Sequence, residues 1–354
     1  MHRYAGKLMD GLSEKYIEIY SEIKKNWDRI AKPLDSLGKL EEIICRIGAV
    51  EGTVHPKCEK SAVLVLCADN GIVEEGVSQS GQEVTRICAE NIAAGKTAVG
   101  AIAKISGTKI ITADFGINTD ESIPGVLDFK IRKGTRNFLK ESAMTKEEAE
   151  EAIGKGMELA LSCRKSGFDI LCLGEMGIGN TTTSAAVAAS ILKCEASKTA
   201  GRGAGLSSSG LERKISVIQR AIKKYSLYEK SAFEILRTVG GFDIAGMAGV
   251  CLAAKKHGIP VVLDGAVSMA AALAAEKIES GTSRYLIPSH KSREPMASKI
   301  ACELGLEPVL DAGMALGEGS GAVLMMNVIK GALGVYENCV PFEKSGVKQY
   351  TRYD

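Results

Sequence analysis

The stretch "FDILCLGEMGIGNTTTSAAVAASIL", residues 168–192, decides the fold class. It begins with a short apolar run and ends in an alanine-rich segment that is typical of a buried helix. Between them, Gly177 and Gly179 allow close approach of the backbone to a ligand, and Asn180 with three threonines supplies polar groups at the first helical turn. The stretch predicts a buried strand, a glycine-rich turn and a helix whose N-terminus faces an anion.

Four more segments share the form of an apolar run that ends in an acid and a glycine: residues 62–71, 107–116, 258–267 and 306–319. Their alternation with helical stretches predicts an α/β fold, a parallel sheet with helices on both faces. Ligands gather at the carboxyl ends of such strands, which predicts a site among the acids that end these runs: Asp69, Asp114, Glu175, Asp264 and Asp311. For a single Asp-Gly pair, turn and helix-capping chemistry is the alternative, and it stays open for Asp114, Asp264 and Asp311.

The N-terminal part of the chain has a different pattern. Residues 3–28 carry apolar side chains at helical spacing among charges, which predicts one or two amphipathic helices closed by Pro33. A further helix is expected at residues 37–50.

Composition narrows the class of protein. The 354 residues carry 45 Lys and Arg against 43 Asp and Glu, a net charge of +2 without a dense basic block, so nucleic acid is not an expected partner. The ten cysteines are scattered without a C-x-x-C pair, which favours reduced thiols in a cytoplasmic protein over a zinc site or disulfides. We expect no metal site from the four dispersed histidines, no secretory signal, and no membrane span, since Asp264-Gly265 interrupts the most apolar window.

Two further features bear on an anion site. The glycine-rich turn lacks the lysine of a P-loop, which argues against an ATPase or kinase, and helix capping alone remains an alternative. A second glycine-rich turn at residues 201–206 precedes a predicted helix that would supply Lys214. Glu318 stands between two glycines at an expected helix start, as either a first-turn acid or a group presented to a ligand.

Motifs in order along nearly the whole chain resemble those of the nicotinate-nucleotide:dimethylbenzimidazole phosphoribosyltransferase family. They lie at residues 34–41, 68–85, 174–186, 201–206, 240–249, 263–273, 289–295 and 316–322. The resemblance implies a Rossmann-like large domain at 56–335, a small helical domain formed by 1–55 and 336–354, and a homodimer. It implies transfer of the 5-phosphoribosyl group of nicotinate mononucleotide to 5,6-dimethylbenzimidazole, with inversion from β to α and without a cofactor.

The same resemblance implies roles for individual residues. Glu318 matches the catalytic base, and Glu175 matches a second acid near the ribose and the reacting carbon. The residues expected at the phosphate and ribose are Gly177, Gly179, Asn180, Thr181, Gly203 and Lys214. Those expected at the aromatic base are Ser78, Arg86, Leu316, Ser289 and His290.

Three departures from the family pattern fall where the acceptor base should bind. Asn70 stands where the pattern has His, Ser80-Gly81 where it has an aromatic-Pro pair, and Arg86 where it has Gln. Arg86 is either a solvated helix residue or a pocket residue that favours an oxygen-bearing acceptor. The acceptor therefore stays open among dimethylbenzimidazole, another benzimidazole, a purine and a phenol. A non-catalytic nucleotide-binding subunit is a further alternative, against which the presence of both glutamates counts.

Overall fold

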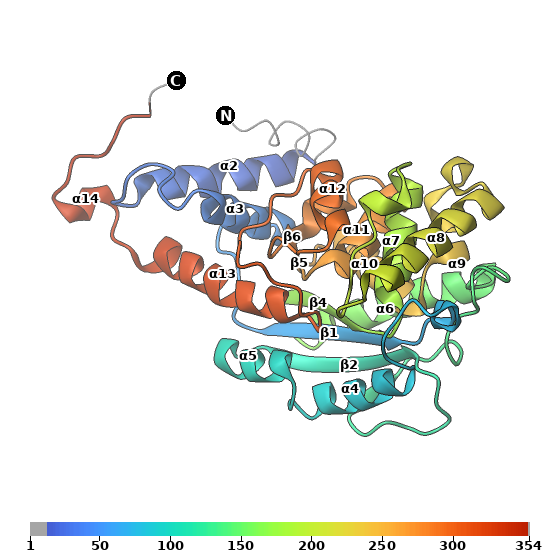
Figure 1. The fold of residues 1–354 in the computed structure, drawn as a ribbon. Coiled ribbons are helices and arrows are strands. Elements are labelled where there is room, and N and C mark those ends of the chain that lie inside the picture. The colour runs from blue at the N-terminus through green and yellow to red at the C-terminus, as the bar shows by residue number, and fades with distance from the viewer. Residues whose placement is uncertain (1–12, 353–354) are drawn as a thin grey trace.

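A six-stranded parallel sheet forms the centre of the computed structural model, which describes residues 13–352 (Figure 1). The strands are β1 (Ser61–Ala68), β2 (Lys109–Gly116), β3 (Val126–Asp128), β4 (Ile170–Met176), β5 (Val261–Leu263) and β6 (Leu286–Pro288). Their order is β3-β2-β1-β4-β5-β6 and all neighbours pair in parallel. This is the doubly wound Rossmann order, in which the winding direction reverses between β1 and β4. The predicted fold class is confirmed.

Helices cover both faces of the sheet. Alternate residues of β1 separate the two cores, because Leu64 and Leu66 belong to one hydrophobic cluster whereas Val63 and Val65 belong to the other. The first cluster includes α6 (Lys146–Lys165), α7 (Asn180–Ile191), α8 (Ser208–Tyr225), α9 (Ala232–Val239), α10 (Phe242–His257), α11 (Ala266–Ile278) and α12 (Pro295–Leu304). The second includes α2 (Glu14–Arg29), α3 (Lys39–Glu51), α4 (Glu83–Ala93), α5 (Ala98–Ser106) and α13 (Ser320–Asn338).

Short elements complete the chain. They are the 3₁₀ turns η1 (Gly71–Glu75), η2 (Ala196–Lys198), η3 (Leu227–Glu229) and η4 (Thr282–Tyr285), and the one-turn helix α14 (Phe342–Ser345). Within residues 13–352, no helix is long and apolar enough to cross a bilayer. All ten cysteines are free thiols.

The expectation of a strand within residues 306–319 is wrong. This segment is irregular and makes a single parallel bridge, from Leu310 to His290. Pro308 has no backbone N–H to give to a strand ladder, and only Val309 and Leu310 follow it before Asp311. The structure instead adds two strands of three residues each, β3 and β6, which are too short to produce an alternating pattern.

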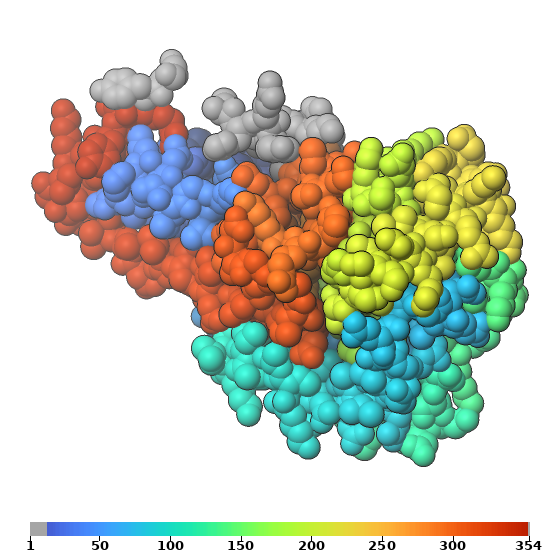
Figure 2. Space-filling model, viewed as in Figure 1, coloured from blue at the N-terminus to red at the C-terminus, as the bar shows by residue number. Residues whose placement is uncertain are grey.

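The two ends of the chain pack together at one end of the molecule, where the blue and red segments adjoin in Figure 2. The Trp27 ring of α2 lies 5.0 Å from the Tyr336 ring of α13. Ile30 and Pro341 form an antiparallel bridge, and Arg352 pairs with Asp28 at 2.7 Å. The helix predicted up to residue 28 is therefore present as α2, and its expected part at residues 3–12 lies outside the described residues.

The predicted division at residues 55–56 and 335–336 stays a prediction. Contacts join the chain ends, as the resemblance implied, but α13 continues without a break across residues 335–336. The core between α2 and α3 is also continuous with the face of β1 that carries Val63 and Val65.

Replacement of Trp27 by alanine should lower the free energy of unfolding by roughly 3–5 kcal/mol, because it removes a fully buried ring that joins the two ends of the chain. Denaturant-induced unfolding followed by circular dichroism measures the change. Lys25→Ala on the same helix, where the side chain is exposed, is the matched control. Equal stability of the two variants would mean that this contact does not hold the chain ends.

Candidate functional site

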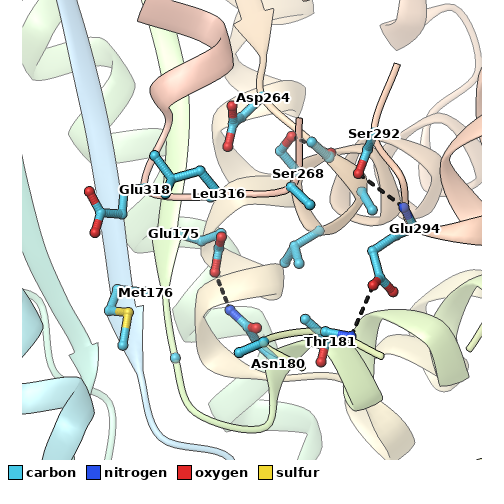
Figure 3. Close-up of a pocket in the computed structure, with 18 of the residues that line it drawn as sticks. Glu175, Met176, Asn180, Thr181, Asp264, Ser268, Ser292, Glu294, Leu316 and Glu318 are labelled. Carbon is cyan, nitrogen blue, oxygen red and sulfur yellow. Dashed lines mark hydrogen bonds between the residues drawn. The ribbon is translucent and has the colours of Figure 1, made fainter. Parts of the chain in front are cut away.

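A cavity of about 220 Å³ opens at the carboxyl ends of β4 and β5 (Figure 3). We call it the site cavity. It lies at the edge of the sheet where ligands bind in open α/β folds. The predicted site residues that line it are Glu175, Gly177, Asn180, Thr181, Gly203, His290, Leu316 and Glu318.

The glycine-rich turn between β4 and α7 is shaped by its contacts with β1. A Cβ at Gly177 would lie 2.3 Å from the Ala68 carbonyl oxygen, so only glycine lets the turn pack against the end of β1. Gly179 has a φ of 94° and is the N-cap of α7, a conformation that favours glycine. Asn180 follows as the first helical residue, with its side chain directed into the site.

Asn180 links a half-buried acid, Glu175, to a fully buried one, Asp243. Its Nδ2 donates to Glu175 Oε2 and, at 3.2 Å, to Asp243 Oδ2. Burial raises the pKa of Glu175, against the effect of this hydrogen bond. Burial and the charge of Glu175 together raise the pKa of Asp243 to about 7. Asp243 was missed in the sequence, although it lies in the motif at residues 240–249.

Glu318 is presented by an unusual turn. Gly317, Glu318 and Gly319 have φ values of 89°, 61° and 87°, so a non-glycine residue sits in the left-handed region between two glycines. The turn packs on β4 at Gly174, where a Cβ would lie 2.6 Å from the Glu318 carbonyl oxygen. Left-handed backbone at a non-glycine residue is strained and persists only where its surroundings enforce it, as at functional sites.

Asp264 anchors this turn from the end of β5. Its carboxylate accepts backbone N–H groups from Gly319 at 3.2 Å, Gly321 at 2.7 Å and Ala322 at 3.3 Å. Burial and the charge of Glu175 raise the pKa of Asp264 to about 7, against the effect of these bonds. Asp264 therefore caps a helix, but one that lies far along the chain, beginning at Ser320.

The Glu318 carboxylate points away from that of Glu175 (Figure 3). Its Oε2 accepts the backbone N–H of Val99 at 3.3 Å, in the first turn of α5. This bond ties the Glu318 side chain to the N-terminus of α5.

Lys214 lies behind the wall of the site cavity. It is fully buried, and its Nζ donates to Thr181 Oγ1 at 2.9 Å and to the Gly201 carbonyl oxygen at 3.1 Å. Burial lowers its pKa to about 8. Nearby, Glu294 Oε1 accepts the backbone N–H of Gly203 at 3.0 Å. The sequence analysis did not single out Glu294, although it lies in the motif at residues 289–295.

The residues expected at the aromatic base are dispersed. Ser78 and Gly179 line a second cavity of about 110 Å³, which shares Gly177, Asn180 and Thr181 with the first. Ser289 is buried, its Oγ donating to the Asp264 carbonyl oxygen at 3.0 Å, and burial lowers the pKa of neighbouring His290.

Arg86 lies outside both cavities. On α4, it donates to Glu121 Oε2 at 2.7 Å, a contact between side chains that are both partly exposed. This geometry favours the helix-residue interpretation of Arg86 over the pocket interpretation.

The expectation that all five strand-end acids form one site needs correction. Only Glu175 and Asp264 line the site cavity. Asp69 accepts the Asn118 N–H at 2.8 Å and Asp114 the Ile117 N–H at 2.7 Å, so both hold the loop after β2. Asp311 is exposed and pairs with Lys291, because its segment is not a strand of the sheet. No group of three or more His, Cys, Asp or Glu placed to hold a metal occurs in residues 13–352.

Comparison with known proteins identifies the family of this chain. A family model described as phosphoribosyltransferase matches residues 14–347. The chain is 41% identical over 342 residues to the nicotinate-nucleotide–dimethylbenzimidazole phosphoribosyltransferase of Acetivibrio thermocellus, covering 97% of each chain. It is 42% identical over 332 residues to the protein of the same name from Alkaliphilus metalliredigens, covering 93% of this chain and 95% of the relative.

A solved structure of an enzyme with the same name also resembles this chain. The crystal structure of nicotinate-nucleotide–dimethylbenzimidazole phosphoribosyltransferase from Thermus thermophilus is similar with a TM-score of 0.88 and 36% identity, covering 94% of this chain and 99% of that chain. The chain belongs to the phosphoribosyltransferase family whose members include these enzymes.

Proposed function

We propose that this protein transfers the 5-phosphoribosyl group of nicotinate mononucleotide to 5,6-dimethylbenzimidazole, giving α-ribazole 5′-phosphate and nicotinate with inversion at the anomeric carbon. The observation that carries the proposal is the left-handed turn that presents Glu318 at the site cavity, which Glu175, Asn180 and Thr181 also line. We further propose that it acts as a homodimer in the cytoplasm, on small molecules alone.

The leaving group of the proposed reaction departs without help from an acid of the enzyme. In the donor, the ring nitrogen of nicotinate is a pyridinium bonded to C1 of the ribose. When the C1–N bond breaks, its electron pair stays on the nitrogen, and the ring departs as a neutral pyridine. No acid is needed to protonate it. Developing positive charge on C1 is stabilised by a nearby carboxylate, and Glu175 at the floor of the site cavity is the proposed group.

The acceptor needs a base. As one ring nitrogen of dimethylbenzimidazole forms the new bond to C1, its other nitrogen must lose a proton, or the ring becomes a cation. Glu318 is the proposed acceptor of that proton, and its hydrogen bond from Val99 keeps the carboxylate oriented before the acceptor arrives.

The donor's phosphate serves as a remote handle that places C1 against the nucleophile. The proposed contacts are Gly177, Gly179, Asn180 and Thr181 at the start of α7, together with Gly203. Lys214 acts through Thr181 in the described geometry, because its Nζ bonds to the Thr181 hydroxyl and does not line the cavity. The Ser78, Ser289, His290 and Leu316 side chains are the proposed surroundings of the aromatic ring.

A panel of acceptors tests the reaction. Purified protein incubated with nicotinate mononucleotide and dimethylbenzimidazole should release nicotinate and form α-ribazole 5′-phosphate, measured by liquid chromatography and mass spectrometry. Other benzimidazoles, adenine and p-cresol are run in parallel. A product with adenine or p-cresol and none with dimethylbenzimidazole would refute the proposed acceptor, whereas no product with any acceptor would refute the transferase.

Glu318→Gln should lower kcat by about 10²–10⁴-fold, because an amide cannot take the acceptor's proton. The Kd of nicotinate mononucleotide, measured by calorimetry, should not change. Glu337→Gln, on the exposed part of the same helix, is the control and should retain full activity. Turnover that survives in the Glu318 variant would remove this residue from the base role.

Binding of the donor should weaken above pH 8. Lys214 carries its charge below its lowered pKa of about 8 and loses it above, so attraction for the phosphate is complete at pH 7 and declines as pH rises. The Kd of nicotinate mononucleotide should increase by up to about tenfold per pH unit above that point. Nicotinate riboside, which lacks the phosphate, is the control and should show a flat profile. Parallel profiles for both ligands would exclude Lys214 as the phosphate's cation.

A further inference from the structure

Glu294 reaches across the second glycine-rich turn. It is the N-cap of α12, ahead of Pro295, and its carboxylate points to the Thr181 side of the site cavity (Figure 3). Oε1 accepts the Gly203 N–H at 3.0 Å. A Cβ at Gly201 would lie 2.2 Å from Oε2, so the carboxylate packs directly on the Gly201 backbone. The missing side chain at Gly201 leaves this space for the acid.

The place that this carboxylate occupies has the character of an anion subsite. Backbone N–H groups of glycine-rich turns are the donors that bind phosphates. Lys214 is fully buried a short way behind, with only the neutral oxygens of Thr181 and Gly201 as described hydrogen-bond partners. The negative charge of Glu294 acts on Lys214 and offsets part of the burial effect on its pKa.

The second carboxylate oxygen of Glu294 lacks the hydrogen bond that the first one makes. Oε2 is buried and has no hydrogen-bond partner in the described structure. A buried carboxylate oxygen without a partner is costly, so the carboxylate is not held there by full satisfaction of its own bonds.

We propose that Glu294 is a stand-in anion, which occupies the phosphate subsite of the free enzyme and gives way when the phosphate of the donor binds. The inference rests on the proposed function, because that phosphate is the ligand that takes its place. Two anions cannot share the Gly203 N–H, and repulsion between them opposes binding of a lone phosphate. A phosphate that arrives with ribose and base gains further contacts that drive the exchange. Glu294 is therefore a specificity-determining residue that rejects inorganic phosphate.

The test is the binding of inorganic phosphate to Glu294→Gln. The amide keeps the size of the side chain and removes its charge. Calorimetric titration at pH 7.5 should give a Kd for phosphate about tenfold lower than for the unmodified protein. Inorganic phosphate should likewise become a stronger competitive inhibitor against nicotinate mononucleotide. Glu303→Gln, on the same helix with its carboxylate paired to Lys277 at the surface, is the matched control and should bind phosphate as the unmodified protein does.

Two outcomes would overturn the inference. One is phosphate affinity in Glu294→Gln that is equal to or weaker than in the control. The other is loss of affinity for nicotinate riboside with phosphate binding unchanged, which would make Glu294 a ribose ligand. Equal melting temperatures of the two variants show that both are folded. Because the titration needs no turnover, it decides the role of Glu294 separately from the acceptor panel, which decides the reaction.

Discussion

The bond between the Asp264 carboxylate and the start of α13 is the interaction on which the site depends. One buried acid at the end of β5 accepts three backbone N–H groups between residues 319 and 322. These are unpaired donors at a helix N-terminus, so the interaction satisfies the helix and the acid at once. It also fixes the left-handed turn just before the helix, and with it the position of Glu318. The bare Gly174 on β4 supplies the surface on which that turn rests.

Around this anchor, the site separates its charges. Acids with raised pKa values, Glu175, Asp243 and Asp264, gather at the ends of β4 and β5 and at the start of α10. The buried cation is Lys214 of α8, whose Nζ donates a hydrogen bond to the Thr181 hydroxyl of α7. In the proposed reaction, the donor carries a positive ring and a negative phosphate at opposite ends of its ribose. Apart from Glu294, which gives way in the proposed exchange, the separation of acidic and basic groups within the site therefore matches the separation of charge within the donor.

The sequence predicted those parts of the molecule that are local. The strand, turn and helix at residues 168–192 follow from a buried apolar run, glycines and an alanine-rich segment, all within one window. The same pattern was wrong at residues 306–319, where a proline and a short apolar run could not sustain a strand. β3 and β6 were missed because, unlike the equally short β5, they are not followed by an acid and a glycine.

The missed site residues have a different cause. Asp243 meets Asn180 across 63 positions of the chain, and Glu294 meets Gly203 across 91. No spacing rule connects such positions, and both acids look like ordinary first-turn or N-cap residues of their helices. Arg86 follows directly after a motif, and the sequence left it as either a solvated helix residue or a pocket residue. Its bond to Glu121, 35 positions along the chain, favours the first.

α13 connects the site with the far end of the molecule. Its first residue adjoins the turn of Glu318, and its last turns carry Tyr336 against Trp27 of α2. Its 19 residues of α-helix form a rod of about 28 Å. One end of α13 follows directly after the turn that carries the proposed base, and the other end packs against α2 near the N-terminus of the chain. The packing of Tyr336 on Trp27 therefore helps to hold the same helix whose first residues Asp264 anchors beside Glu318.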